Sequence, residues 1–368
     1  MSGERPRGVQ HLFALAREPR FAGGAGEARA RRYAADTLHA LGFTVAEEPF
    51  EYSAFPGTLA LPLASGWLLL AIIGEISGLL GVAPSWLARV ATDVGLAGVA
   101  VIIVKAARRA WPLRSGVMRR HGINLTAMRG AAMPRVWLVA HLDTKSQPVP
   151  SAVRGAAILV LALGALATAV LAIRGAEEPG TVPARMVLWG IALLSVVAAL
   201  PLMACVPGDR SHGAVDNASG VAAVLVAAEA MREGAAVGIL LTSAEELGMA
   251  GAEAWAATRA PGVALNCDGV DDVGELTILH QRWPSPRVID ALRAAASGPV
   301  RARRMPVGIL TDSTALHRAG WETATLSHGS LATLRRLHRP SDSLASMTGR
   351  SINGAGRVLA AAAEALAR

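Results

Sequence analysis

Hydrophobic and polar positions divide the chain into two kinds of pattern. Four stretches carry few or no charges, and a helix that crosses a bilayer needs about 20 apolar residues. The two later stretches, 155–173 and 186–208, contain no charged residue, and a short polar turn with Pro and Gly joins them. They predict one transmembrane helical hairpin.

The earlier apolar stretches predict a second hairpin over about 57–105. Residues 58–74 are uncharged, Glu75 follows, and uncharged chain returns after Arg89 and Asp93. Arg89 and Asp93 are four residues apart, so that they are able to pair on a helix near the turn. The alternative is that all these helices lie buried in a large soluble core, and the interrupted first pair keeps that alternative open.

The remaining sequence alternates between strand and helix patterns. Apolar positions in 26–41 follow a helical period that stops at Gly42, and the run FTVAEEPFEY alternates like a pair of strands. Four short apolar runs predict strands at 136–140, 237–242, 263–267 and 323–327. Helical patterns separate them at 219–232, 249–258 and 287–296. This order favours an α/β fold with a doubly wound, mostly parallel sheet.

The predicted organisation is one α/β domain that two membrane hairpins interrupt. The expected segments are 1–56 in the domain, 57–105 as hairpin 1, 106–152 in the domain, 153–207 as hairpin 2, and 208–368 in the domain.

Composition agrees with a membrane protein that has a globular part. Of the 368 residues 52% are hydrophobic and 17% are charged, against about 25% charged in ordinary soluble domains. This excludes intrinsic disorder. The net charge is +8, but two Tyr and five Phe offer no stacking platform, so we expect no nucleic-acid partner. The first twenty residues lack the apolar core of a secretory signal, and we expect none.

Acidic and histidine side chains follow three of the predicted strands directly. The run VWLVA leads into His141-x-Asp143, GILLTSA into Glu245-Glu246, and VALNC into Asp268. Because the carboxyl ends of parallel strands meet at one edge of the sheet, these side chains are expected to lie close together.

Two further motifs complete a candidate metal site. Asp216-Asn217-Ala218-Ser219-Gly220 precedes a predicted helix, and His338 precedes Asp342 near the end of the chain. Taken singly, each motif also fits a plain structural role, such as an exposed turn, a solvated acidic pair or a helix N-cap. Together they supply nitrogen and oxygen ligands without a thiolate, which suits Zn²⁺, Mn²⁺ or Co²⁺.

At this point the sequence resembles a known family. The motifs that carry the resemblance are His141-x-Asp143, Asp216-Asn217-x-x-Gly220, Glu245-Glu246-x-Gly248, Asp268 and His338 before Asp342. They resemble the di-zinc aminopeptidases, which include aminopeptidase Y and the bacterial leucyl aminopeptidases, with glutamate carboxypeptidase and the glutaminyl cyclases as relatives. The resemblance covers about 1–55, 120–150 and 207–368. One departure is Leu337, where that family often has Tyr before the histidine.

The resemblance implies two zinc ions per chain and a role for each motif. One zinc would be held by His141 and Asp268, the other by Glu246 and His338, and Asp216 would bridge them. Glu245 would be the general base, and Asp143 would orient the His141 ring. The implied activity is that of a metallo-aminopeptidase, which hydrolyses N-terminal residues from peptides.

Other polar residues near these motifs receive structural interpretations. We expect His212 on a loop or rim, and His317 and His328 in packing roles. Asp312 resembles a family residue that shapes the substrate pocket, although capping of a helix explains it equally well. Asp271 and Asp272 follow Asp268, but only Asp268 comes directly after the strand.

The 72 residues between Asp143 and Asp216 include a whole predicted hairpin, whereas the resembling family connects these motifs in a dozen or so. Both hairpins leave and rejoin the same domain, so we expect the metal cleft close to the lipid bilayer, where membrane-associated peptides are natural substrates. Arg and Lys between 105 and 120 outnumber Arg89, Arg174 and Arg185 at the opposite turns. The positive-inside rule then places the catalytic domain in the cytoplasm.

Three other functions remain open at this stage. A glutaminyl-cyclase-like acyltransferase would use one zinc and the same glutamate. A non-catalytic membrane scaffold of this fold is expected to lack ligands, and here all five positions are filled. A transporter is disfavoured because only Glu75, Arg89 and Asp93 fall within the predicted spans.

Overall fold

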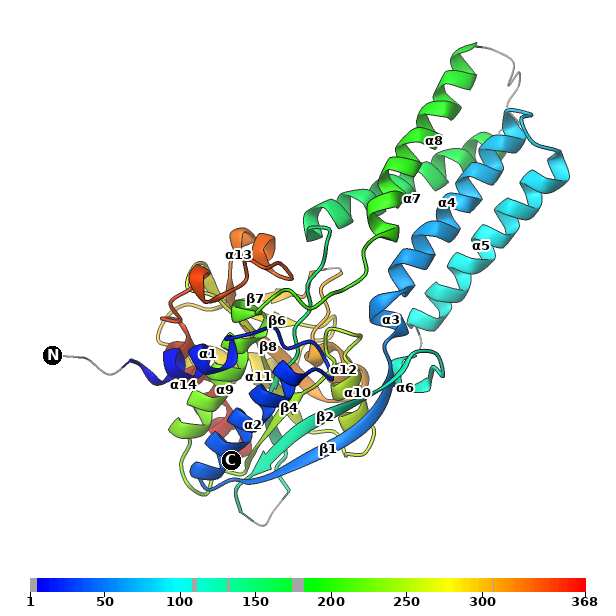
Figure 1. The fold of residues 1–368 in the computed structure, drawn as a ribbon. Helices are drawn as coiled ribbons and strands as arrows, with labels where there is room; N and C mark the ends of the chain where they lie inside the picture. Colours follow the sequence, from blue (N-terminus) through cyan, green and yellow to red (C-terminus); the bar gives the residue numbers. More distant parts are fainter. Residues whose placement is uncertain (1–4, 108–110, 131–132, 174–181, 307) are drawn as a thin grey trace. The chain divides into compact units, whose positions relative to one another are not determined.

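The computed structural model describes residues 5–107, 111–130, 133–173, 182–306 and 308–368 (Figure 1). The chain divides into two compact units, each made of separate stretches of sequence. Unit 1 consists of Met1–Ala54, Pro112–Ser146 and Gly208–Arg368. Unit 2 consists of Phe55–Trp111 and Gln147–Pro207. The apolar stretches of the sequence lie in unit 2, and the strands lie in unit 1.

Unit 1 is built on an eight-stranded sheet with the order β1-β2-β4-β3-β5-β8-β6-β7. The strands are β1 (Thr44–Ser53), β2 (Arg119–Met128), β3 (Val136–His141), β4 (Val237–Thr242), β5 (Val263–Val270), β6 (Glu275–His280), β7 (Arg301–Arg304) and β8 (Glu322–Gly329). The pairs around the centre, β4–β3, β3–β5 and β5–β8, are parallel, as is β6–β7. The pairs β1–β2, β2–β4 and β6–β8 are antiparallel. The mostly parallel α/β sheet predicted from the sequence is confirmed.

Both faces of this sheet are covered by helices, and strand β3 shows why. Its side chains point alternately to opposite faces. Val136, Leu138 and Ala140 join a large core with α1, α2, α9, α11 and α14, whereas Trp137 and Val139 join a second core with α10 and α12. All of β3 is buried, which explains its continuous apolar run.

The helices of unit 1 are α1 (Arg7–Leu15), α2 (Ala25–Ala40), α9 (Gly220–Ala230), α10 (Ala250–Ala256), α11 (Pro286–Ala295), α12 (Asp312–Arg318), α13 (Leu331–Arg336) and α14 (Ile352–Ala367), with the short turns η1 (Ala214–Ser219) and η2 (Leu344–Ser346). Four of these helices, namely α2, α9, α10 and α11, begin and end close to the predicted positions, and no ranges were predicted for the other helices of unit 1. Helix α2 stops where Gly42 adopts a φ of 78°, as predicted.

The prediction of two strands in FTVAEEPFEY is wrong. These residues form the single strand β1, which pairs along its whole length with β2, from Thr44 opposite Met128 to Ser53 opposite Arg119. Pro49 lies in its middle, and because β1 is the edge strand of the sheet, a residue without an N–H is tolerated there. Strand β2 was not predicted, nor were β6 and β7.

Unit 2 contains four long apolar helices. The helices of this part of the chain are α3 (Phe55–Thr58), α4 (Ala60–Leu79), α5 (Ser85–Ala107), α7 (Ser151–Ile173) and α8 (Val182–Met203), and the single turn α6 (Trp111–Arg114) follows α5. By length and composition alone, α4, α5, α7 and α8 are able to cross a membrane. Helices α4 and α5 pack closely because α5 presents glycine at the contact: a Cβ at Gly98 would overlap the indole of Trp67.

Many apolar side chains of unit 2 are exposed. Leu193 is 66% exposed, Ile173 is 85% exposed and Trp189 is 57% exposed. A soluble core would bury such residues, so the alternative of buried soluble helices is disfavoured. Arg89 and Asp93 both lie on α5 and are exposed, and none of the ion pairs among the described residues joins them, contrary to expectation. Arg108, Arg109 and Arg174 lie outside the described residues.

Candidate metal centre

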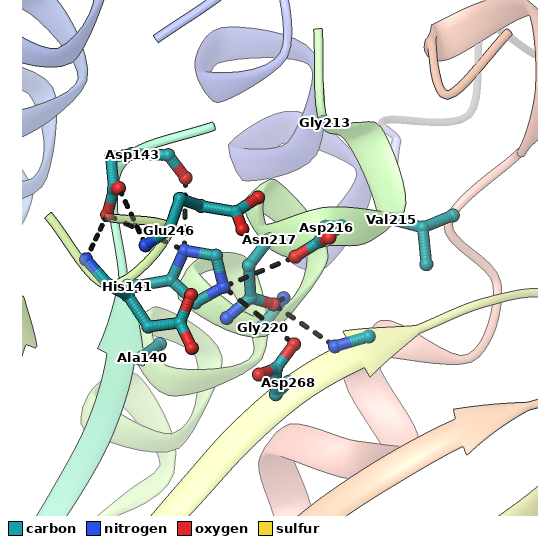
Figure 2. Close-up of polar contacts among 12 residues, drawn as sticks. Ala140, His141, Asp143, Gly213, Val215, Asp216, Asn217, Gly220, Glu246 and Asp268 are labelled. Carbon is teal, nitrogen blue, oxygen red and sulfur yellow. Dashed lines mark hydrogen bonds and ion pairs between the residues drawn. The ribbon is translucent and has the colours of Figure 1, made fainter. Parts of the chain in front are cut away.

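Five side chains with metal-binding chemistry meet at the carboxyl end of the central strands of unit 1. They are His141 at the end of β3, Asp216 in η1, Glu246 after β4, Asp268 in β5 and His338 after α13. Figure 2 shows four of them, His141, Asp216, Glu246 and Asp268. Because β3, β4 and β5 are parallel neighbours, their carboxyl ends lie at the same edge of the sheet. The structure thus brings together all five residues that the sequence singles out as ligands.

These residues form two clusters that share Asp216. In the first cluster His141 Nε2 lies 3.2 Å from Asp216 Oδ1 and 3.8 Å from Asp268 Oδ1. In the second cluster His338 Nε2 lies 3.0 Å from Asp216 Oδ2 and 3.2 Å from Glu246 Oε1. The two carboxylate oxygens of Asp216 therefore face different histidines, which is the arrangement required of a bridging ligand.

The donor set fits two zinc-like cations. In each cluster one histidine nitrogen and two carboxylate oxygens lie within 4.8 Å of one another, and all five residues are largely buried. Three protein ligands with room for water or substrate are typical of catalytic zinc sites. Nitrogen and carboxylate donors without sulfur suit Zn²⁺, Mn²⁺ and Co²⁺ alike.

The electrostatics of the centre point the same way. Burial alone lowers the pKa of His338, but Glu246 and Asp216 outweigh it and raise this pKa to about 9. The pKa of His141 is likewise raised well above its usual value by the surrounding carboxylates, against the effect of burial. Both shifts reflect a strongly negative potential between the two histidines, and such a potential attracts divalent cations.

Glu245 lies beside the clusters and belongs to neither. It is 8% exposed, and burial together with the carboxylates of Glu246 and Asp312 raises its pKa well above the usual value. A carboxylate that takes up a proton this readily is suited to general base catalysis. Ala244, directly before it, adopts a left-handed φ of 56°, and His338 adopts one of 61°, so two positions of the centre carry backbone strain.

Asp143 supports the centre in a way that the sequence did not indicate. Its two carboxylate oxygens accept the backbone N–H groups of Glu245 and Glu246, each at 3.1 Å. The Nδ1 atom of His141 lies 3.0 Å from the backbone carbonyl of Asp143 and 3.7 Å from its Oδ1. The carboxylate of Asp143 therefore holds the turn that carries Glu245, whereas the nearest contact of Asp143 with the His141 ring is made by its backbone carbonyl.

Two polar residues that were not assigned roles hold Asp216 and the segment around it in place. The carboxylate of Asp342 accepts the backbone N–H of Val215 at 2.7 Å and that of Asp216 at 3.1 Å. The side chain of Asn217 donates to Cys267 O and accepts from Gly269 N, and so joins η1 to strand β5 on both sides of Asp268. Asn217 follows Asp216 in its motif, and Asp342 ends the segment that begins at His338, but the spacing of these motifs did not reveal the contacts.

Arg20 is a further support that sequence reasoning missed. It is 1% exposed and donates to four backbone carbonyls, those of Leu15, Leu142, His212 and Gly213. It thereby fastens the loop after β3 to the loop before η1. A buried arginine paired with carbonyl groups leaves no hydrophobic or motif signal in the sequence.

The remaining candidates lie outside the two clusters. Asp312 is buried near Glu245, accepts from the Thr242 hydroxyl, and has a pKa that burial raises to about 7. His212 lies on a loop with its Nδ1 3.1 Å from Ala16 O. Asp271 and Asp272 belong to neither cluster. Asp271 pairs with Arg336, and Asp272 accepts the backbone N–H groups of 348–350. His317 lies at the end of α12, and His328 lies in β8.

Comparisons with known proteins agree with this site. Residues 195–363, which carry Asp216, Glu246, Asp268 and His338, match the model of peptidase family M28. No curated protein matches the chain by sequence.

Several solved structures share the fold. The zinc aminopeptidase BSAP from Bacillus subtilis is 14% identical with a TM-score of 0.57, over 98% of this chain and 95% of that one. An aminopeptidase from Aneurinibacillus sp. strain AM-1 is 15% identical with a TM-score of 0.56, over 97% and 92%. A glutaminyl cyclase from Fimbriiglobus ruber is 16% identical with a TM-score of 0.54, over 97% and 94%.

Residues 195–363 thus match peptidase family M28, and the chain shares the fold of zinc aminopeptidases and of a glutaminyl cyclase. With the M28 match over 195–363 and this fold, the resemblance to the di-zinc aminopeptidases and their glutaminyl cyclase relatives that the motifs predict is confirmed.

Proposed function

We propose that this protein is a membrane-bound, zinc-dependent aminopeptidase that removes N-terminal residues from peptides. The observation that carries the proposal is the position of Asp216, whose two oxygens face His141 and His338 at 3.2 and 3.0 Å. A shared carboxylate between two ligand clusters is what a two-metal hydrolase needs, because its negative charge offsets the repulsion between two cations about 3.5–4 Å apart.

The metals and the protein side chains have different tasks in the proposed reaction. Zinc would be held by His141, Asp216 and Asp268 on one side and by Asp216, Glu246 and His338 on the other, and would supply Lewis acidity toward the scissile carbonyl and the attacking water. Glu245 accepts the proton of that water and passes it to the leaving amine. Asp143 keeps the backbone of Glu245 in place during this transfer.

The membrane part of the proposal rests on unit 2. Helices α4, α5, α7 and α8 have 20 to 23 residues, low charge and many exposed apolar side chains. Two hairpins that cross the bilayer return to the side from which they start, so both leave unit 1 on one side. Lys105 and the arginines that follow it up to Arg120 favour the cytoplasmic side for unit 1. Peptides at the membrane surface are the substrates that this attachment favours.

A panel of chromogenic amides tests the activity. Detergent-purified protein should hydrolyse aminoacyl amides with a free α-amine and leave the N-acetylated counterparts intact. Glu245→Gln should abolish turnover while the metal content, measured on the same samples, stays at about two per chain. Turnover that survives Glu245→Gln, or a wild type that binds no metal at all, would refute the proposal.

Cysteine labelling tests the membrane topology. The native Cys205 and Cys267 are buried, so a single introduced cysteine reports its own accessibility. Val82 is 58% exposed in the turn between α4 and α5, and Ser297 is exposed in unit 1. A membrane-impermeant maleimide should label Val82→Cys in intact cells and Ser297→Cys only after permeabilisation. The reverse pattern would place unit 1 outside the cytoplasm.

A glutaminyl-cyclase-like activity is the second candidate, favoured by the structural similarity to the Fimbriiglobus ruber enzyme. The discriminating substrate is a peptide with N-terminal glutamine. Loss of ammonia with no peptide-bond cleavage, together with an inactive amide panel, would replace the aminopeptidase proposal with cyclisation. A metal-free, inactive protein would instead fit a scaffold of this fold.

A further inference from the structure

Lys145 points into the metal centre, although no motif drew attention to it. The contacts of the residues that follow β3 alternate along the chain: Asp143 and Lys145 contact Glu246, and the residues between and before them contact other partners. Leu142 lies in the core, and Thr144 contacts Arg20 and Ser211 on the side away from the centre. His141, Asp143 and Lys145 therefore share the side that faces the metal ligands.

The backbone on both sides of Lys145 is fixed. Thr144 N donates to Arg20 O at 3.0 Å. Ser146 and Gly208 exchange two backbone hydrogen bonds, of 2.7 and 2.9 Å. Lys145 lies between these anchors, so its direction toward the centre is imposed by the chain and does not depend on the flexibility of a loop.

The ammonium group of Lys145 contacts Glu246 twice. Its Nζ lies 2.7 Å from Glu246 Oε2 and 3.3 Å from the backbone carbonyl of the same residue. The Lys145 side chain is only 15% exposed. Two of its three N–H donors thus have partners on one residue, which leaves little capacity to recognise a substrate carboxylate.

Because of this contact, the two carboxylate oxygens of Glu246 face different side chains. Oε2 faces Lys145, while Oε1 faces His338 Nε2 at 3.2 Å. Only one oxygen is then free for a metal beside His338. In addition, a fixed positive charge lies next to that position and repels a second cation.

The first cluster has no comparable ion pair with a Lys or Arg side chain among the described residues. The ion pairs of His141 and of Asp268 within the described residues involve only the other site residues. The composition strengthens the argument. The sequence contains 36 Lys and Arg residues but only two lysines, Lys105 and Lys145, so a compact ammonium at this buried point stands out in a chain that otherwise uses arginine.

We propose that Lys145 is a positioning residue that holds Glu246 to one-oxygen metal binding, and that it makes the His338-side metal the weaker of the two. This inference rests on the proposed two-metal site and goes beyond it. The His141 side would keep its metal at low free zinc, while the His338 side would fill only at higher free zinc. The number of metals bound, and with it the active fraction, would then follow zinc supply.

Metal titration of the full-length protein in detergent tests this proposal. The protein is dialysed against chelator-buffered zinc over a range of free concentrations, and the bound zinc per chain is measured by mass spectrometry. The wild type should fill in two separate steps. Glu246→Gln should remove the step at higher free zinc and leave the first, which identifies the weaker site.

Lys145→Met is the decisive variant. Loss of a unit charge a few ångströms from the metal should tighten the second step by about tenfold or more and bring the two steps together. Lys145→Gln, which keeps a hydrogen bond to Glu246 without the charge, should do the same and serves if the Met variant folds poorly. Lys145→Arg keeps the charge and should retain separate steps. Lys105→Met makes the same chemical change on helix α5 of unit 2 and should match the wild type.

The possible outcomes separate this inference from the proposed function. If Lys145→Met and Lys145→Gln leave both steps unchanged, or weaken the second, the inference is wrong while the two-metal site stands. Weakening would mean that Lys145 only orients Glu246, as a conventional supporting residue does. A wild type that binds no zinc at any concentration overturns the proposed function and this inference together.

Discussion

Replacement of Asp143 by Asn tests how the candidate metal centre positions Glu245, the proposed general base. The carboxylate of Asp143 is fully buried and accepts the N–H groups of Glu245 and Glu246, each at 3.1 Å. Asparagine has nearly the same shape, but it keeps only one acceptor oxygen and turns its NH₂ group toward the other N–H. One charge-assisted bond is lost, and one buried N–H is left without an acceptor.

The expected magnitude follows from these two contacts. A hydrogen bond to a charged group contributes about 1.5–3 kcal/mol, and a buried group without a partner costs about 1–3 kcal/mol. Because the turn relaxes in part, we expect the free energy of unfolding to fall by about 2–4 kcal/mol. At about 2–4 °C for each kcal/mol, the melting temperature should fall by about 5–15 °C.

The Asp143→Asn change should also lower the catalytic rate of the folded protein. The displaced turn carries Glu245, so kcat is expected to fall by about 10–100-fold, the range seen when a partner of a metal ligand is removed. KM should change little, because the lost contact matters for proton transfer more than for substrate binding. Thermal unfolding, kcat and KM are measured on the same preparation below its melting temperature.

Asp36→Asn is the matched control, since Asp36 is exposed on α2 and the chemical change is the same. It should behave like the wild type in every measurement. An Asp143→Asn variant with unchanged melting temperature and unchanged kcat would show that the two hydrogen bonds do not position Glu245, and the reasoning would fail.

Three further predictions concern other parts of unit 1. Arg20→Met removes four hydrogen bonds to buried carbonyls and should lower the free energy of unfolding by about 3–5 kcal/mol in denaturant titrations; a loss below about 1 kcal/mol would contradict the assigned role. Burial lowers the pKa of His11 in the folded protein, although Glu229 opposes this effect. The unfolded chain therefore binds more protons, and the free energy of unfolding should fall as the pH drops from about 6.5 to the lower pKa that His11 has in the folded protein. His11→Gln should flatten this dependence between pH 7.5 and 5.5, and an unchanged slope would refute the assignment. Removal of metal by a chelator should lower the melting temperature reversibly, because zinc at 100 times its dissociation constant stabilises by about 2.7 kcal/mol; an unchanged melting temperature would argue against bound metal.

The sequence was most informative where a strand ends in a ligand. Strands β3, β4 and β5 are buried on both faces, so their apolar runs are continuous and the polar residue that ends each run stands out. Parallel order then places His141, Glu246 and Asp268 at one edge without any knowledge of side-chain geometry. This is why the candidate ligands could be predicted and why the structure brings them together.

Elements that depend on distant partners were not predictable in the same way. Strand β2 begins with two arginines and contains Gly122, which gives it no clear alternation. In the sequence, its partner β1 is separated from β2 by the whole of hairpin 1. In the structure, a Cβ at Gly122 would overlap the ring of Phe50 on β1. The glycine that weakens the strand signal is therefore required by the packing of the strand.

The supporting residues were missed for a related reason. Arg20, Lys145 and Asp342 act through backbone groups or through a single carboxylate oxygen, and they lie far in sequence from the atoms that they contact. Motif spacing records which residues bind a metal, whereas these contacts depend on how separate loops fold against one another. Only the three-dimensional arrangement contains that information.

The positions of the two insertions explain how this fold accommodates four long apolar helices. Hairpin 1 leaves after β1 and returns before β2, where Ser53 pairs with Arg119 in the antiparallel register. Hairpin 2 leaves at Ser146 and returns at Gly208, which form their own two-bond bridge. In both cases the chain leaves and re-enters unit 1 through paired residues, so the inserted length adds little strain to the sheet. Because the second of these stems directly follows Lys145, the point where hairpin 2 is attached is also the point that fixes a charge beside the metal ligands.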